Sequence, residues 1–286
     1  MMEKDNIKVG ENAFPSALIR TAAWLCVVTA LLGLVGTAAL LNPDYRVYVL
    51  RDLAASGITA ESSLRGYFTV RSVVVIVMPI WTGFLAVCLM AIYYRKSFRG
   101  WSAIATVTHR AVWLLNALGI LLICLYVYRF ARYTVACMGE RDGLHPFLAM
   151  AVSEVPLGIF VCWLFLQFRK FLNGLSESAV SIAYTMSAGT LDSVSIPASA
   201  ATGFLILGIL SAIYAVGEMF TVTVAYDGIR AYYKLLVSGR PEQIITVAAL
   251  IFNSGSSFVL YQYLRRYKQI SERLLYENRK RILNMQ

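Results

Sequence analysis

Long apolar segments separated by short charged joints dominate this sequence. Residues 72–93 and 111–128 show the pattern most cleanly, because neither segment contains a formal charge. A helix needs about 20 consecutive apolar residues to cross the hydrocarbon core of a bilayer, and it satisfies its own backbone hydrogen bonds there. We therefore predict an all-α, polytopic integral membrane protein.

The composition agrees with a membrane location and argues against a nucleic-acid-binding protein. The chain is 58% hydrophobic and 15% charged, whereas soluble domains are about 25% charged. Its formal net charge is +10, but no basic run is interleaved with aromatic residues in the way typical of DNA- or RNA-binding surfaces. The composition therefore favours the lipid bilayer, and not a nucleic acid, as the partner.

The apolar segments predict six membrane-spanning helices, which are residues 17–41, 68–94, 111–132, 147–168, 200–225 and 244–264. The first span is too long for a cleavable signal peptide, and its N-terminal flank contains acidic as well as basic residues. The predicted organisation has three parts, which are a cytoplasmic N-terminal segment (1–16), a six-helix transmembrane domain (17–264) and a basic amphipathic cytoplasmic tail (265–286).

Lysine and arginine are distributed unequally between the two sides of these spans. With both termini in the cytoplasm, the inner segments carry most of the lysines and arginines, including the pairs Arg95-Lys96, Arg169-Lys170 and Arg265-Arg266. Short cytoplasmic segments of membrane proteins are enriched in these residues. The pattern predicts cytoplasmic termini and a plasma-membrane protein, and it favours a bacterial inner membrane.

The second and fourth spans resemble each other. Each contains a proline, Pro79 or Pro156, and each ends in a basic pair that is followed by a glycine and a serine at the same spacing. This similarity fits three repeated helical hairpins, but a basic pair after an apolar helix is also an ordinary positive-inside stop. Mitochondrial carriers have three hairpins too, but the odd spans lack their Pro-x-Asp/Glu-x-x-Lys/Arg signature, which excludes that family.

Glu218 is the sharpest candidate for a functional side chain, because it lies about two-thirds of the way through the fifth span. A carboxylate in the membrane is costly unless it is paired, protonated or facing water. Glu218 is predicted either to contact an ion, a proton or a substrate, or to pair with an outer arginine such as Arg71, Arg129 or Arg132.

The sixth span contains a polar stretch near its centre, residues 253–257. Asn253, Ser254 and Ser256 could line a broken or water-filled helix and bind a substrate or an ion. Small and hydroxylated residues also let membrane helices pack closely and hydrogen-bond, and the fifth span contains residues of the same type. Spans five and six are therefore predicted to form a tight pair around Glu218 and Asn253.

Further polar residues in the spans complete the candidate set. Arg71 of the second span and Glu154 of the fourth could form an ion pair in the outer third of the membrane, with Arg129 and Arg132 at the outer end of the third span. We expect this ion-pair network to be structural. Asn116 of the third span could bind a substrate or an ion, or form a hydrogen bond to a neighbouring helix.

Two segments outside the spans are predicted at the inner surface. Residues 171–199 are rich in Ser, Ala and Thr, and we expect a short surface helix followed by a loop. The tail at residues 265–286 is expected to be helical. It would either dock on a partner subunit or on anionic lipid, or continue span six into solvent.

Catalytic and cofactor motifs are absent from the sequence. It contains no HExxH, GxSxG or Walker A motif, no GxGxxG in a strand–helix context, and no Cys/His cluster with metal-ligand spacing. We therefore predict no enzyme activity, cofactor or metal. The favoured function is a transporter or channel-type component of unknown substrate. The alternatives are a permease subunit of an ABC-type transporter, and a non-transporting accessory or sensing protein whose tail binds a partner.

Overall fold

The computed structural model describes residues 7–8, 14–41, 61–138, 144–191, 195–225 and 241–285. In these ranges the chain forms six long helices and one pair of two-residue strands. The helices are α1 (Ser16–Leu41), α3 (Glu61–Arg95), α4 (Arg99–Met138), α5 (Leu144–Ala188), α6 (Ala198–Ala225) and α8 (Pro241–Met285). Strand β1 (Ile7–Lys8) pairs antiparallel with β2 (Thr190–Leu191).

Five of the described helices contain segments that are long and apolar enough to cross a membrane, as the predicted all-α membrane fold requires. These segments are Ser16–Ala38, Ile76–Arg95, Arg99–Leu121, Ala198–Gly217 and Ile244–Lys280. They overlap five of the six predicted spans. The predicted fourth span, residues 147–168, is helical and lies inside α5, but α5 is not among these five segments.

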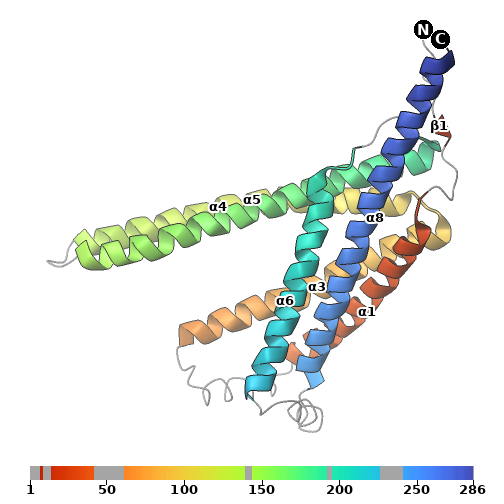
Figure 1. Cartoon of the computed structure of the whole chain (residues 1–286). Helices are drawn as coiled ribbons and strands as arrows, with labels where there is room; N and C mark the ends of the chain where they lie inside the picture. The colour runs from red at the N-terminus through yellow and green to blue at the C-terminus, as the bar shows by residue number, and fades with distance from the viewer. Residues whose placement is uncertain are drawn as a thin grey trace.

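The helices contact one another in a cyclic order (Figure 1). Helix α1 packs on α3 and α8, α8 also packs on α6, and the α4–α5 hairpin connects α3 to α6. Only one end of this hairpin meets the other helices, and the rest extends away from α1, α6 and α8. Its side chains there are exposed, for example Val135 at 71% and Ile159 at 66%. We call the end where all six helices meet the closed end.

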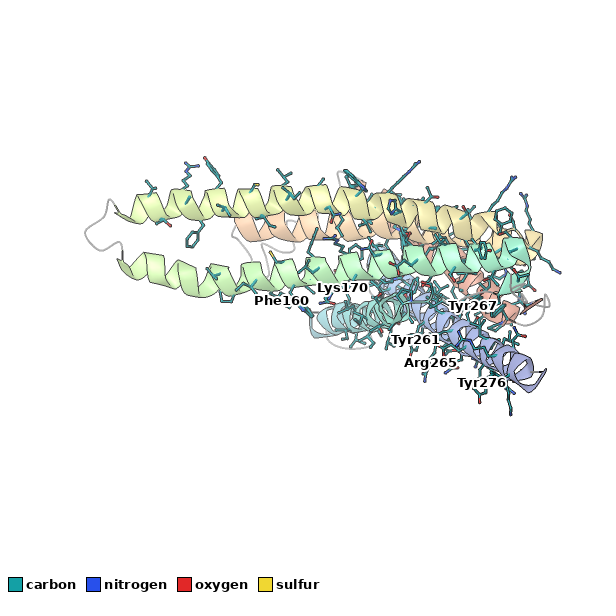
Figure 2. The ribbon with its side chains drawn as sticks, turned by 90° about the horizontal axis from the view of Figure 1, so that it is seen from above. Phe160, Lys170, Tyr261, Arg265, Tyr267 and Tyr276 are labelled. Carbon is teal, nitrogen blue, oxygen red and sulfur yellow. The ribbon has the colours of Figure 1, made fainter. Side chains whose placement is uncertain are left out.

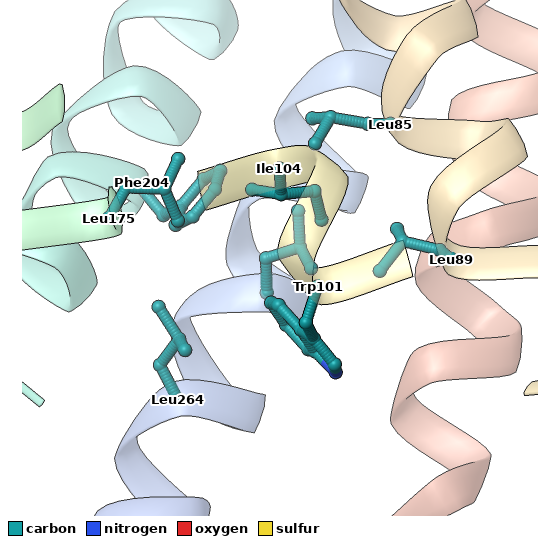
Figure 3. A pocket seen from close by; sticks show the side chains of 8 residues that line it. Leu85, Leu89, Trp101, Ile104, Leu175, Phe204 and Leu264 are labelled. Atoms are coloured by element: carbon teal, nitrogen blue, oxygen red, sulfur yellow. The ribbon is translucent and has the colours of Figure 1, made fainter. Parts of the chain in front are cut away.

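The main hydrophobic core lies at the closed end. Leu89 of α3, Trp101 of α4, Leu175 of α5 and Leu264 of α8 are almost completely buried there. They line a small apolar cavity of about 10 Å³ (Figure 3), which has room for about one water-sized sphere. This cavity is therefore too small to bind a substrate.

A column of aromatic rings joins the start of α1 to α8 at the closed end. The rings of Trp101 and Tyr263 stack with centroids 5.8 Å apart, and those of Phe14 and Tyr267 stack at 4.0 Å. Tyr263 and Tyr267 lie 6.0 Å apart and complete the column. Stacked aromatic pairs add stability beyond the area that they bury. The column therefore fixes the residues before α1 against the second half of α8.

The prediction of a short surface helix in residues 171–199 is wrong. Helix α5 continues without a break to Ala188, and Phe171, Leu175 and Ile182 are buried in the main core. Small residues, which suggested a solvated surface, instead allow close packing between helices. The hydroxyl of Ser176, for example, donates a hydrogen bond to a backbone carbonyl of α4 at 3.1 Å.

The two basic pairs that suggested an internal repeat have different local structures. Arg95 ends α3, and Lys96 adopts a left-handed backbone conformation with φ of 46°. Arg169 and Lys170, in contrast, lie within the continuous helix α5. The sequence similarity at these pairs therefore does not correspond to a common turn.

The C-terminal tail belongs to the same helix as the predicted sixth span. Helix α8 is continuous from Pro241 to Met285, and its second half carries the ion pairs Lys268–Glu272 at 3.9 Å and Arg273–Glu277 at 2.8 Å. Pairs four residues apart stabilise a solvated helix by a few tenths of a kcal/mol each. Tyr276 lies on the part that projects past the other helices (Figure 2). The tail therefore continues span six as a helix.

Every neighbouring helix pair in the cyclic order has a glycine at its contact. A Cβ atom added at each of these glycines would meet a side chain of the adjacent helix. At five of these glycines the added Cβ would lie 3.3 Å or less from that side chain, so the glycine lets the two backbones approach closely. At Gly255 the distance to Leu25 would be 3.6 Å, which is an ordinary van der Waals contact. The contacts are Gly33 with Pro79 (α1–α3), Gly100 with Ile92 (α3–α4), Gly119 with Phe165 (α4–α5), Gly203 with Phe171 (α5–α6), Gly208 with Phe258 (α6–α8) and Gly255 with Leu25 (α1–α8).

Replacing Gly203 by alanine should destabilise the protein, because the new methyl group would overlap the ring of Phe171. Overpacking of this kind costs about 1–3 kcal/mol, which thermal unfolding in detergent would detect. Gly217→Ala is the matched control on the same helix, since an added Cβ there meets nothing within 4 Å. Equal losses in the two variants would contradict this account of the α5–α6 contact.

Candidate functional site

The polar centre of α8 lies against two neighbouring helices. On α6, a Cβ at Gly208 would be 3.3 Å from the ring of Phe258, and on α8 a Cβ at Gly255 would be 3.6 Å from Leu25 of α1. Helix α6 thus packs tightly against this part of α8, and α1 is in ordinary van der Waals contact with it. Predicted spans five and six, in α6 and α8, therefore pack together at Asn253, whereas the place of Glu218 in this pair stays a prediction.

Two hydrogen bonds connect α8 to α6 at this level. The Asn253 side-chain amide donates to the hydroxyl of Ser211 at 2.8 Å, and the Ser254 hydroxyl donates to the carbonyl oxygen of Gly208 at 2.8 Å. Ser256 donates within its own helix, to the carbonyl oxygen of Asn253 at 2.9 Å. Three of the predicted site residues therefore lie together, and each donates a hydrogen bond within the chain.

The same level of the bundle contains buried hydroxyl groups on all four of the helices α1, α3, α6 and α8. Thr29 and Thr82 are 0% and 1% exposed, and each donates back to its own helix at 2.8 Å. Contacts between α1 and its neighbours α3 and α8 bring these groups to a common depth. We call these hydroxyl groups, together with the half-buried amide of Asn253, the hydroxyl layer; its members are Thr29, Thr82, Ser211, Asn253, Ser254 and Ser256.

The hydroxyl layer is uncharged but retains hydrogen-bonding capacity. A hydroxyl oxygen that donates one bond still has lone pairs that can accept another or approach a cation. The hydroxyl protons of Thr29, Thr82 and Ser254 are already donated, either to their own helix or to α6. The bonds from Asn253 and Ser254 therefore stabilise the α6–α8 contact directly. The layer can interact with a cation or a hydrogen-bond donor without losing those bonds.

Sequence reasoning missed two members of this layer. Thr29 and Thr82 are single hydroxyl residues in apolar runs, and such residues commonly bond to the carbonyl four residues earlier. The weak signal that accompanies them is a glycine within four residues of each, Gly33 and Gly83, which lets α1 and α3 approach. Cys26, also buried, lies beside the Ser256 hydroxyl.

The other predicted site residues lie elsewhere or cannot be assigned contacts. Asn116 is half-buried in the α4–α5 hairpin, away from the hydroxyl layer, and Arg132 is exposed near the end of α4. The remaining four lie on α3, α4, α5 and α6, and their side chains are outside the described part of the structure. They are Arg71, Arg129, Glu154 and Glu218. The ion-pair network stays a prediction.

Known proteins do not add to this description. The chain matches no protein-family model, and comparisons with curated proteins and with solved structures gave no match either. Within the described ranges, no three His, Cys, Asp or Glu residues come together as metal ligands.

The bond between Asn253 and Ser211 should couple α6 to α8 energetically. Interhelical hydrogen bonds in membranes contribute about 0.6 kcal/mol on average and up to about 1.7 kcal/mol. A double-mutant cycle with Asn253→Ala and Ser211→Ala, followed by unfolding in mixed micelles, should give a coupling energy in that range. Ser178→Ala is a suitable control partner, because Ser178 bonds within α5. A coupling equal to that control would show that the bond contributes nothing.

Proposed function

We propose that the chain is a six-span membrane protein with both termini in the cytoplasm. Support comes from the closed end, where Phe14 stacks on Tyr267 at 4.0 Å and β1 contacts α8. The start of α1 and the second half of α8 thus lie on the same side, which an even number of crossings requires. Basic residues such as Arg95 and Arg265 are found at this end, as expected for a cytoplasmic face.

Within this topology we propose a transporter or channel-type component of unknown substrate. The observation that carries this proposal is the hydroxyl layer, a set of polar side chains contributed by four apolar helices at one depth. Polar groups at such positions mark substrate and ion pathways in many membrane proteins. The layer would be the contact that a polar or cationic substrate makes on its way across.

Glu218 would add a negative charge to the same pathway. It follows Ser211 by seven residues on α6, which corresponds to about 10 Å along a helix axis. A carboxylate two helical turns from uncharged oxygens would favour cations over anions. The predicted role of Glu218 as an ion or proton contact therefore fits the position of its helix residue.

A second candidate is the non-transporting accessory or sensing protein. The observation that favours it is the exposed end of α8, where Tyr276 is 67% and Leu283 is 70% exposed beyond the bundle (Figure 2). A projecting helix with exposed apolar side chains is suited to binding a partner. The ABC-type permease is a special case of a transporter, and copurification of an ATPase subunit would support it.

Water access to the hydroxyl layer separates the two candidates. In a chain whose five cysteines are replaced by alanine, Asn253→Cys would be treated in proteoliposomes with a membrane-impermeant methanethiosulfonate. Thiolates form where water reaches the sulfur. A pathway therefore predicts labelling roughly 10-fold faster at Asn253→Cys than at a lipid-facing position.

Two controls bracket this measurement. Ile251→Cys, at a position 52% exposed within the apolar part of α8, should react slowly, and Tyr276→Cys on the projecting tail should react fast. Labelling of Asn253→Cys as slow as that of Ile251→Cys would exclude a water-filled pathway through the hydroxyl layer. The accessory function would then be favoured.

A further inference from the structure

A basic and aromatic patch surrounds the turn between α3 and α4 at the closed end. We call it the interfacial patch, and it combines cations from three helices with exposed aromatic rings. The last turn of α3, the first turn of α4 and the second turn of α1 all contribute to it. Its members are Arg20, Trp24, Tyr93, Tyr94, Arg95, Lys96, Phe98 and Arg99.

Packing of α1 on α3 fixes the position of Arg20. Its guanidinium carbon lies 5.9 Å from the centroid of the Tyr93 ring, within the range of a cation–π contact. Tyr94 meets Tyr93 edge to face at 4.8 Å. The contact restrains the Arg20 side chain while the guanidinium stays exposed. The charge is thus held beside the end of α3, where the next cations follow in sequence.

The turn itself is ordered by its own hydrogen bonds. The Ser97 hydroxyl accepts a bond from the Arg99 amide at 3.3 Å, and the Ser97 amide donates to the Ala91 carbonyl at 3.3 Å. Lys96 adopts a left-handed backbone, with φ of 46°, at a position where glycine is the usual residue. A lysine therefore occupies a position whose backbone conformation favours glycine.

Acidic residues are absent from this part of the sequence. No aspartate or glutamate occurs between Glu61 and Glu140, a stretch that contains α3 from its second residue and all of α4. Arg95 and Arg99 therefore have no acidic neighbour on their own helices. A bound anion would supply negative charge beside these two arginines.

The aromatic members place this anion at the membrane surface. Trp24 lies one turn inward from Arg20 and is 52% exposed, and Tyr94 and Phe98 are 60% and 44% exposed. Exposed aromatic rings of this kind prefer the headgroup level of a bilayer. A basic cluster at the same level attracts anionic lipids. An acidic protein segment would not require exposed aromatic rings at that depth.

We propose that the interfacial patch binds the headgroup of an anionic phospholipid. The phosphate lies among Arg20, Arg95 and Arg99, with Lys96 contributing a further charge, and the acyl chains pass along the exposed face of α1 beneath Trp24. This site is independent of the proposed transport function, because it lies at the closed end and not at the hydroxyl layer.

The test compares phosphatidylglycerol with phosphatidylcholine. Native mass spectrometry of the detergent-purified chain would count lipids retained at equal concentrations of each. Wild type should prefer phosphatidylglycerol. Arg95→Gln combined with Arg99→Gln should reduce that preference by roughly 20-fold, because each cation near an anionic surface contributes about fivefold in affinity.

A second pair of substitutions controls for net charge. Arg279→Gln with Lys280→Gln removes two exposed cations from the projecting part of α8 and should leave the preference unchanged. An equal loss in this control would reduce the effect to overall charge and overturn the proposal. Absence of a preference in wild type, or its survival in the Arg95/Arg99 variant, would overturn it too. Loss of a copurifying acidic protein in that variant, without a lipid preference, would assign the patch to a protein partner instead.

Lys96→Gly keeps the test valid if the double variant folds poorly. Glycine adopts the left-handed conformation without strain, so thermal stability without added lipid should rise by about 2 °C. The preference for phosphatidylglycerol should fall by roughly fivefold in the same variant. A preference that does not fall although the charge is lost would contradict a role for Lys96 in headgroup binding.

Discussion

Close approach between helices is the constraint on which this structure depends. Helices in a bilayer gain little from hiding apolar surface from one another, because lipid tails are as apolar as leucine. Their association relies on dense packing and on hydrogen bonds between helices. Glycines at five of the six contacts in the cyclic order supply the first, and the bonds from Asn253 and Ser254 to α6 supply the second. The hydroxyl layer exists where these two requirements coincide.

The closed end is tightly packed, whereas most of the projecting hairpin has few contacts with the other helices. At the closed end, Trp101 and Tyr267 are nearly fully buried and join the chain start to α8 through stacked rings. In the hairpin, α4 and α5 touch mainly each other, with Gly119 against the ring of Phe165. The apolar side chains on the rest of the hairpin surface face outward, as suits lipid. Tight packing is therefore concentrated at one end of the molecule.

The sequence predicted which segments are helical and which two spans pair. It did not predict where the helices end on the inner side of the membrane. Apolar length reports how much of a helix lies in lipid, so the residue ranges of α1 and α6 were close to the predicted spans. It says nothing about a helix that continues past the membrane. Residues 171–188 contain many small polar residues, yet Ile182 is completely buried, because a small residue serves a solvated surface and a tight helix contact equally well.

The sequence predicted only those members of the candidate site whose residue type is unusual in an apolar span. Asn253 stands out because an amide is rare at the centre of an apolar span, whereas Thr29 and Thr82 satisfy their own hydroxyl groups within one turn and leave no sequence signal. The left-handed Lys96 was also missed, since lysine in a basic pair after an apolar helix is explained by the positive-inside tendency alone. Hydrogen-bond partners that lie on another helix can be identified only when the packing of the helices is known.

Packing and transport make compatible demands on the hydroxyl layer. A bond such as Asn253–Ser211 is worth about 0.6 kcal/mol in a membrane protein, which is comparable with the thermal energy at 25 °C. A polar substrate that replaced one of these bonds would therefore meet a small energetic barrier from that bond. Helices α6 and α8 would stay together while the substrate replaced that bond, since Gly208 lets them pack closely at Phe258. In the proposed transport function, weak and exchangeable hydrogen bonds within a tightly packed frame would let one layer both hold the helices together and contact a passing ion or solute.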